Sequence, residues 1–349
     1  MTEFIVQTIN GLTLAGVIFL VSSGFTLIFG VMRVTSLVHG AIFLLGGYVA
    51  YSAIQHTNNF FWGLAAGTLA MGALGLLVER GLLPLLRHSE MAELLATLGL
   101  VYVIDDLSLA IWGGNPLNIT LPGVLNESTT LPYHGIVYPN DRFFILGVSV
   151  AVAALLYVLL RRTRVGAIIR AGVDDRDMVG ALGINVRVVF SAVFVLGFAL
   201  AGFAGVLGVP IVGLAPGNDT TILLLALAVV VIGGLGSYEG AILGSVIIAL
   251  ADTYGTAYFP AVSYSVLFIP LVVVLLVRPQ GLLGRRAALC ATAAVRPPAR
   301  ARRPSLPLRG GRSPSPTSRP GPCSPWRPLA SSPTSCCRAA TCLRSSRTC

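Results

Sequence analysis

Residues 161–187, RRTRVGAIIRAGVDDRDMVGALGINVR, form a long polar segment between two long apolar runs. The segment carries six Arg and three Asp, in a chain of which only 11% of the residues are charged. Such a segment does not enter the hydrocarbon core of a membrane, whereas the runs beside it are long enough to cross one. We expect the segment to be a helical surface that docks a cytoplasmic partner.

The composition excludes a soluble globular protein. The 349 residues are 55% hydrophobic, with a mean hydropathy of +0.82, while a soluble domain has about 25% charged residues. The chain is therefore expected to be an all-α, polytopic bundle of transmembrane helices. Its formal charge of +10 does not indicate nucleic-acid binding, because residues 1–286 carry 13 Arg and all 14 acidic residues and so sum to −1.

The excess charge lies in residues 287–349, which hold 11 Arg and no acidic residue. This tail is rich in Pro and Ser and contains all six cysteines, at spacings that match neither a paired CxxC zinc site nor a disulfide framework. It has no apolar periodicity, so we expect disorder. Two explanations stay open: a genuine basic extension, or a GC-rich gene read out of frame beyond codon 286.

Nine apolar runs in residues 1–286 are candidate spans, since a span needs about 20 apolar residues. They cover residues 8–30, 37–55, 60–83, 92–113, 142–160, 188–212, 219–236, 239–257 and 261–277. Arg accumulates in alternate connections, which the positive-inside rule places in the cytoplasm. We therefore predict that the N-terminus lies outside and the C-terminus lies in the cytoplasm.

Five ionisable residues in or beside the spans are candidates for a pathway or an intramembrane polar role, since such residues are costly in lipid. They are His39, Asp105, Asp106, Glu239 and Asp252. Asp105 and Asp106 point about 100° apart on a helix, so at most one faces a given path. We expect His39 to contact the neighbouring loop backbone and Glu239 to cap the start of its helix.

Within the polar segment we expect a helix from about residue 174 to residue 182. Acidic residues near its start would interact favourably with the helix dipole, and Gly183 would end the helix. Its apolar stripe would seat in a groove of a partner protein. The alternative is a surface helix lying against its own helix ends. The residues concerned are Asp174, Asp175, Asp177, Met178, Ala181, Leu182, Gly183 and Ile184.

Catalytic motifs are missing from the sequence. No GxxxxGK[ST] phosphate loop occurs, and with no Lys in the chain none can form, so any ATP must bind to another chain. No HExxH or GxSxG motif occurs either. We expect neither an enzyme nor a bound metal or cofactor.

Several stretches resemble the permease subunits of bacterial ABC importers for branched-chain amino acids, the LivH type. The resemblance spans about residues 5–286 and rests on three groups of motifs. They are Asn10-Gly-Leu-Thr-Leu with Gly24-Phe-Thr-Leu-Ile-Phe-Gly-Val-Met-Arg, His39-Gly and Gly46-Gly-Tyr; Gly233-Gly-Leu-Gly-Ser with Gly240-Ala and Gly244; and Arg278-Pro-Gln-Gly-Leu-Leu-Gly.

The resemblance implies an inner-membrane permease that works with a second permease subunit, two cytoplasmic ATPases and a periplasmic binding protein. It also implies that residues 161–187 insert into a groove on the ATPase. The family's Leu-Gly-Ile triplet is kept at residues 182–184, whereas Asp177-Met178-Val179 replaces an expected Glu-Ala-Ala. A proton-coupled secondary transporter, a channel for a small polar solute, and the permease of a related urea or amide importer stay open as alternatives.

Overall fold

The computed structural model describes residues 2–32, 36–82, 84, 90–119, 121, 123, 128–130, 137–174 and 176–283. The chain divides into two units, Met1–Leu289 and Cys290–Cys349, and all described residues belong to the first. The expectations for the basic tail, and for Asp175, therefore fall outside the described residues.

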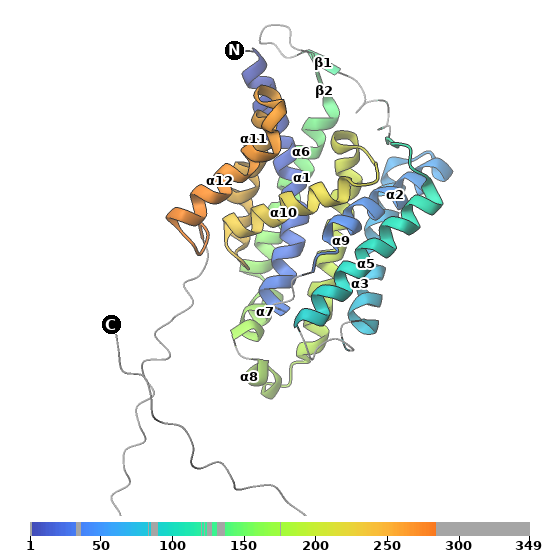
Figure 1. The fold of residues 1–349 in the computed structure, drawn as a ribbon. Coiled ribbons are helices and arrows are strands. Elements are labelled where there is room, and N and C mark those ends of the chain that lie inside the picture. Colours follow the sequence, from blue (N-terminus) through green and yellow to red (C-terminus); the bar gives the residue numbers. More distant parts are fainter. Residues whose placement is uncertain are drawn as a thin grey trace, which may run out of the picture. The chain divides into compact units, whose positions relative to one another are not determined.

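All nine expected spans are helices, most with ends within a few residues of the predicted ones (Figure 1). They are α1 (Thr2–Met32), α2 (His39–Thr57), α3 (Phe60–Gly81), α5 (Glu90–Trp112), α6 (Asn140–Arg162), α9 (Val186–Val212), α10 (Asn218–Gly233), α11 (Tyr238–Tyr258) and α12 (Ser263–Val277). The polar segment adds α7 (Arg164–Asp174) and α8 (Arg176–Ala181), and a 3-10 turn, η1 (Pro260–Val262), precedes α12. The polytopic all-α architecture is thus confirmed.

Six of these helices, α1, α3, α5, α6, α9 and α11, are long and apolar enough to cross a membrane, by length and composition alone. The other three, α2, α10 and α12, are too short or not apolar enough to meet this criterion, although all nine apolar runs were predicted to be spans. At 16 and 15 residues, α10 and α12 measure about 24 and 22 Å, less than a hydrocarbon core of about 30 Å. α2 has 19 residues, but polar residues at both its ends reduce its mean hydropathy.

The bundle is built around α1 and α9, which pack directly against each other. In their most apolar stretches, 78% and 72% of the residues are buried, against 17% for α5 and α6. α3 lies along α9, α11 lies along α1, and α2 packs on α3 and α9. The glycines of these helices permit close contact because they have no side chain between the backbones. Close contact matters in lipid, where packing rather than the hydrophobic effect drives helix association.

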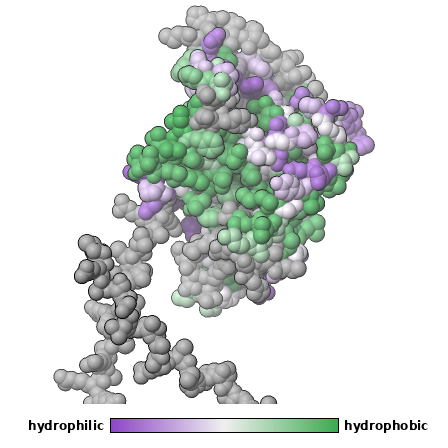
Figure 2. All heavy atoms as spheres, in the orientation of Figure 1, coloured by the Kyte–Doolittle hydropathy of each residue, from purple (hydrophilic) through white to green (hydrophobic). Residues whose placement is uncertain are grey.

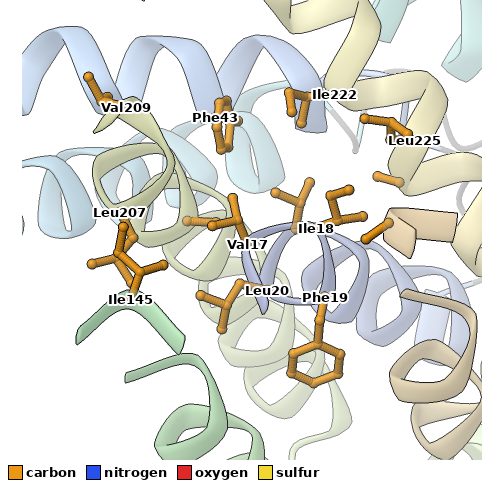
Figure 3. Close-up of a cluster of buried hydrophobic side chains, with 14 of the residues drawn as sticks. Val17, Ile18, Phe19, Leu20, Phe43, Ile145, Leu207, Val209, Ile222 and Leu225 are labelled. Carbon is orange, nitrogen blue, oxygen red and sulfur yellow. The ribbon is translucent and has the colours of Figure 1, made fainter. Parts of the chain in front are cut away.

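The largest part of the core forms where several helices converge on α1, as Figure 3 shows for the side chains around that helix. Val17 of α1 meets Phe43 of α2, Ile145 of α6, Leu207 of α9 and Ile222 of α10 in one buried cluster. Each of these side chains is at most 1% exposed. Helices that are far apart in the sequence are therefore held together by this apolar cluster.

Large apolar side chains also cover the outside of the bundle, and Figure 2 shows hydrophobic residues across the middle of the visible face. Leu69 and Leu77 of α3, Leu95 of α5 and Leu155 of α6 are each at least 66% exposed. Exposed apolar area this extensive is unfavourable in water, so these faces are suited to lipid.

A small hairpin covers the end of the bundle where α1 begins. Strands β1 (Ser128–Thr130) and β2 (Val137–Pro139) pair antiparallel. The hydroxyl of Tyr138 donates a 2.7 Å hydrogen bond to Oδ1 of Asn10, which also accepts one from the guanidinium of Arg142. Burial raises the pKa of Tyr138 above its usual value, so this hydroxyl keeps the proton that it donates. The hairpin is therefore attached to α1.

Candidate functional site

The polar segment folds as two short helices, and the second of them, α8, lies within the helix expected from residue 174 to 182. Asp174 is the last residue of α7, and Arg176 begins α8. The predicted helix is therefore present, whereas α7 was not predicted, because the prediction followed the acidic residues and not the apolar positions upstream, at Ile168, Ile169 and Gly172. Those residues face the bundle and extend the helical structure back to Arg164.

α7 is anchored to the ends of three long helices. Ile169, which is 6% exposed, belongs to a buried cluster with Val31 of α1, Leu156 of α6 and Phe190 of α9. At Gly166, an added Cβ would clash with the carbonyl oxygen of Leu160, so α7 abuts the end of α6. A force applied to α7 would therefore act on α1, α6 and α9 together.

α8 presents the expected apolar stripe to its surroundings. Met178 and Leu182 are 63% and 74% exposed, Ala181 is also exposed, and Val179, at 4%, holds the helix to the bundle. We call Met178, Ala181 and Leu182 the α8 surface. Gly183 follows with φ of +79°, the left-handed conformation that ends a helix, and its N–H donates to Gly180.

The other residues predicted for this segment are Ile184 and the three acidic residues at or near the start of α8. Ile184 follows the helix and is partly buried. The side chains of Asp174 and Asp177, and the whole of Asp175, lie outside the described residues. Whether carboxylates lie beside the N-terminus of α8 is therefore still a prediction.

His39 is fully buried at the start of α2. Its Nδ1 lies 3.4 Å from the carbonyl oxygen of Ser36, and its ring contacts Phe25 and Phe198 edge to face. The expected contact with the loop backbone is present. Its Nε2 is also buried and has no hydrogen-bond partner among the described residues.

The neighbours Asp105 and Asp106 of α5 point in different directions, as the helical geometry requires. Asp106 is exposed, whereas Asp105 is partly buried and lies near enough to the Asp219 carboxyl at the start of α10 to interact with it electrostatically; the Asp105 Oδ1 is buried and has no hydrogen-bond partner among the described residues. Asp219 is only 3% exposed. The sequence analysis missed Asp219; the signal was its place at the first turn of an apolar run, where a carboxylate meets free backbone N–H groups.

Glu239 does not cap α11, so that prediction was wrong. The cap is Ser237, whose side chain accepts a 3.1 Å hydrogen bond from the Gly240 N–H. The Glu239 carboxylate instead forms a salt bridge with Arg161 at the end of α6. A hydroxyl at the N-cap position is favoured because it reaches the third N–H of the helix. Asp252 is half-buried in α11, and its backbone carbonyl accepts from Thr256.

The sequence matches a family described as "Branched-chain amino acid transport system / permease component" over residues 7–277. A curated relative is the high-affinity branched-chain amino acid transport system permease protein BraD of Pseudomonas aeruginosa. It is 30% identical over 305 residues, which cover 81% of this chain and 96% of the relative.

Two further relatives carry similar names. LivH of Escherichia coli K12 is 28% identical over 303 residues, with the same shares of both chains. The probable LivH of Methanocaldococcus jannaschii is 25% identical and covers 76% of this chain and 88% of its own length.

Among solved structures, PsaBC from Streptococcus pneumoniae in complex with Fab aligns with 77% of this chain and 89% of its own, at 18% identity. Its TM-score of 0.42 is too low to support any inference. The family match, by contrast, extends from α1 to the end of α12 and includes the polar segment with α7 and α8. This chain belongs to the family of permease components of branched-chain amino acid transport systems.

Proposed function

We propose that the chain is the membrane-spanning subunit of an ATP-driven importer of branched-chain amino acids in the bacterial inner membrane. In this proposal the end of the bundle with α7 and α8 faces the cytoplasm. A second permease subunit completes the pathway, two ATPase subunits bind at the cytoplasmic end, and a periplasmic binding protein delivers the amino acid at the other end. Family membership supports this transport class over a secondary transporter or a channel.

The observation that carries the proposal is the exposed α8 surface. Its neighbourhood is rich in Arg, including Arg162, Arg164 and Arg187, so it lies outside the hydrocarbon core. Met178 and Leu182 nevertheless expose most of their apolar area. An apolar stripe on a short helix, rimmed by charge, is the geometry that a groove on another protein recognises.

The attachment of α7 supports a coupling role for this surface. A groove that grips the α8 surface would move a helix packed on α1 and α9, the two central helices of the bundle. Closure of the ATPases could in this way be converted into a change between outward and inward access. Interfaces and packed cores respond to such forces as two-state elements.

The experiment is copurification of the ATPase with a tagged permease carrying Met178→Glu and Leu182→Glu. Burying a carboxylate in an apolar groove is strongly unfavourable, so we expect loss of the ATPase with an unchanged amount of permease in the membrane. Val165→Glu is the matched control, since Val165 is a half-exposed apolar residue on the neighbouring α7. Undiminished copurification of the double variant would contradict the docking role.

A further inference from the structure

A pocket opens at the end of the bundle that carries α7. It lies between α1, the end of α6, α7 and the turn that joins α10 to α11, and its volume is about 460 Å³. It is separate from the α8 surface, whose residues do not line it. A volume of this size is ample for a ligand as small as a free amino acid.

The walls of the pocket combine aliphatic side chains with charges of both signs. Leu27, Leu160 and Ile169 supply apolar surface, while Arg161 and Glu239 lie on the same lining as an ion pair. The ion pair joins α6 to α11, and its side chains are 55% and 44% exposed. Neither charge is sealed off, so a ligand can reach both.

Two further polar groups belong to the lining. Arg170 of α7 donates to the carbonyl oxygen of Leu160 with one of its five N–H groups. Thr26 of α1 is 3% exposed, and its Oγ1 has no hydrogen-bond partner among the described residues. An unpartnered buried hydroxyl on a pocket wall is unfavourable unless a ligand or water satisfies it.

We propose that this pocket binds a free α-amino acid with a branched aliphatic side chain. The α-carboxylate accepts hydrogen bonds from the guanidinium of Arg161, the α-ammonium donates to the Glu239 carboxylate, and the side chain packs on Leu27 and Ile169. The identity of the side chain rests on the proposed function; the zwitterion follows from the pair of opposite charges.

The ligand takes the place of the Arg161–Glu239 ion pair, which is a weak interaction. An ion pair between half-exposed side chains contributes little to stability, because water solvates both charges and holding two long side chains is entropically unfavourable. A zwitterion offers each partner a charge-assisted hydrogen bond in exchange. Opening of the Arg161–Glu239 pair is therefore the structural event that accompanies binding.

Binding would also act on the transport machinery. The pocket is walled by α7, and the ion pair that it opens ties α6 to α11. At the cytoplasmic end, where the proposed function places α7, the ligand would be the amino acid that import delivers. Such a site would therefore reduce further import when the product accumulates, through the contacts of α7.

The test is equilibrium binding of radiolabelled leucine to the purified full-length permease in nanodiscs, without ATPase or binding protein. Leucinamide lacks the carboxylate and N-acetylleucine lacks the ammonium, so we expect leucine to bind and neither analogue to compete. Glu239→Gln and Arg161→Gln should each weaken binding by about tenfold or more, the loss of one charge-assisted hydrogen bond. Arg162→Gln is the matched control, because Arg162 is the exposed neighbour that does not line the pocket.

The proposal is overturned if no saturable binding occurs, if both analogues compete as well as leucine, or if Glu239→Gln binds normally. Because the analogues are tested on the unaltered protein, the result does not depend on the folding of a variant. Loss of leucine binding with intact ATP-dependent uptake would overturn this site alone. Leucine binding without any ATPase-dependent uptake would instead overturn the proposed function.

Discussion

Gly24 of α1 and Gly197 of α9 meet backbone to backbone, since a Cβ added to Gly24 would lie 2.5 Å from the carbonyl oxygen of Gly197. Because the two helices form the centre of the bundle, Gly24→Ala must separate them. We expect a loss of about 1–3 kcal/mol in the free energy of unfolding. Thermal unfolding in detergent measures it.

The matched control is Gly99→Ala on α5, where an added Cβ meets nothing within 4 Å. There the higher helix propensity of Ala should stabilise the protein by up to about 1 kcal/mol. If both variants unfolded at the same temperature, the close α1–α9 crossing would be refuted.

Ser237 and Glu239 stand two residues apart at the start of α11 but have different roles. Ser237→Ala removes the hydrogen bond to the Gly240 N–H and should destabilise the protein by about 1 kcal/mol. Glu239→Gln removes only an exposed ion pair, so we expect a change below about 1 kcal/mol. Unfolding of the two variants under the same conditions separates the roles, and a larger effect for Glu239→Gln would reverse the assignment.

Asp105 lies near Asp219, so we expect Asp105→Asn to relieve the repulsion between two carboxylates. The amide can donate an N–H to the Asp219 carboxylate, so stability should rise by about 1 kcal/mol or stay the same. ATP-driven uptake should persist, whereas a proton-coupled transporter would lose its flux. Asp106→Asn, on the exposed side of α5, is the control and should change neither quantity.

The orientation of the bundle remains a prediction from the distribution of Arg, and single cysteines can test it. After replacement of the six tail cysteines by Ser, Leu182→Cys should react with an impermeant maleimide only in inside-out vesicles. His56→Cys, exposed at the far end of α2, should react only in right-side-out vesicles. Labelling of Leu182→Cys in right-side-out vesicles would place the α8 surface outside the cell and so contradict the proposed function.

The helices could be located from the sequence because apolar run length depends only on local composition. Misassignments arose where two local signals competed. The acidic residues at 174–177 indicated a helix start there, so α7 with its apolar residues Ile168 and Ile169 was not predicted. At α11 the carboxylate of Glu239 was predicted to be the cap in place of the neighbouring hydroxyl of Ser237. In both cases packing and hydrogen-bond geometry decided, and neither can be read from residue type alone.

The sequence by itself determined that the chain is a helical membrane bundle with one polar segment, since hydropathy and Arg placement are properties of consecutive residues. Only the tertiary structure decided which charges meet. Asp105 faces Asp219, and Arg161 pairs with Glu239 across 78 positions of sequence. Such pairs follow from where α5 lies relative to α10 and where α6 lies relative to α11, and no single stretch of sequence encodes how whole helices pack.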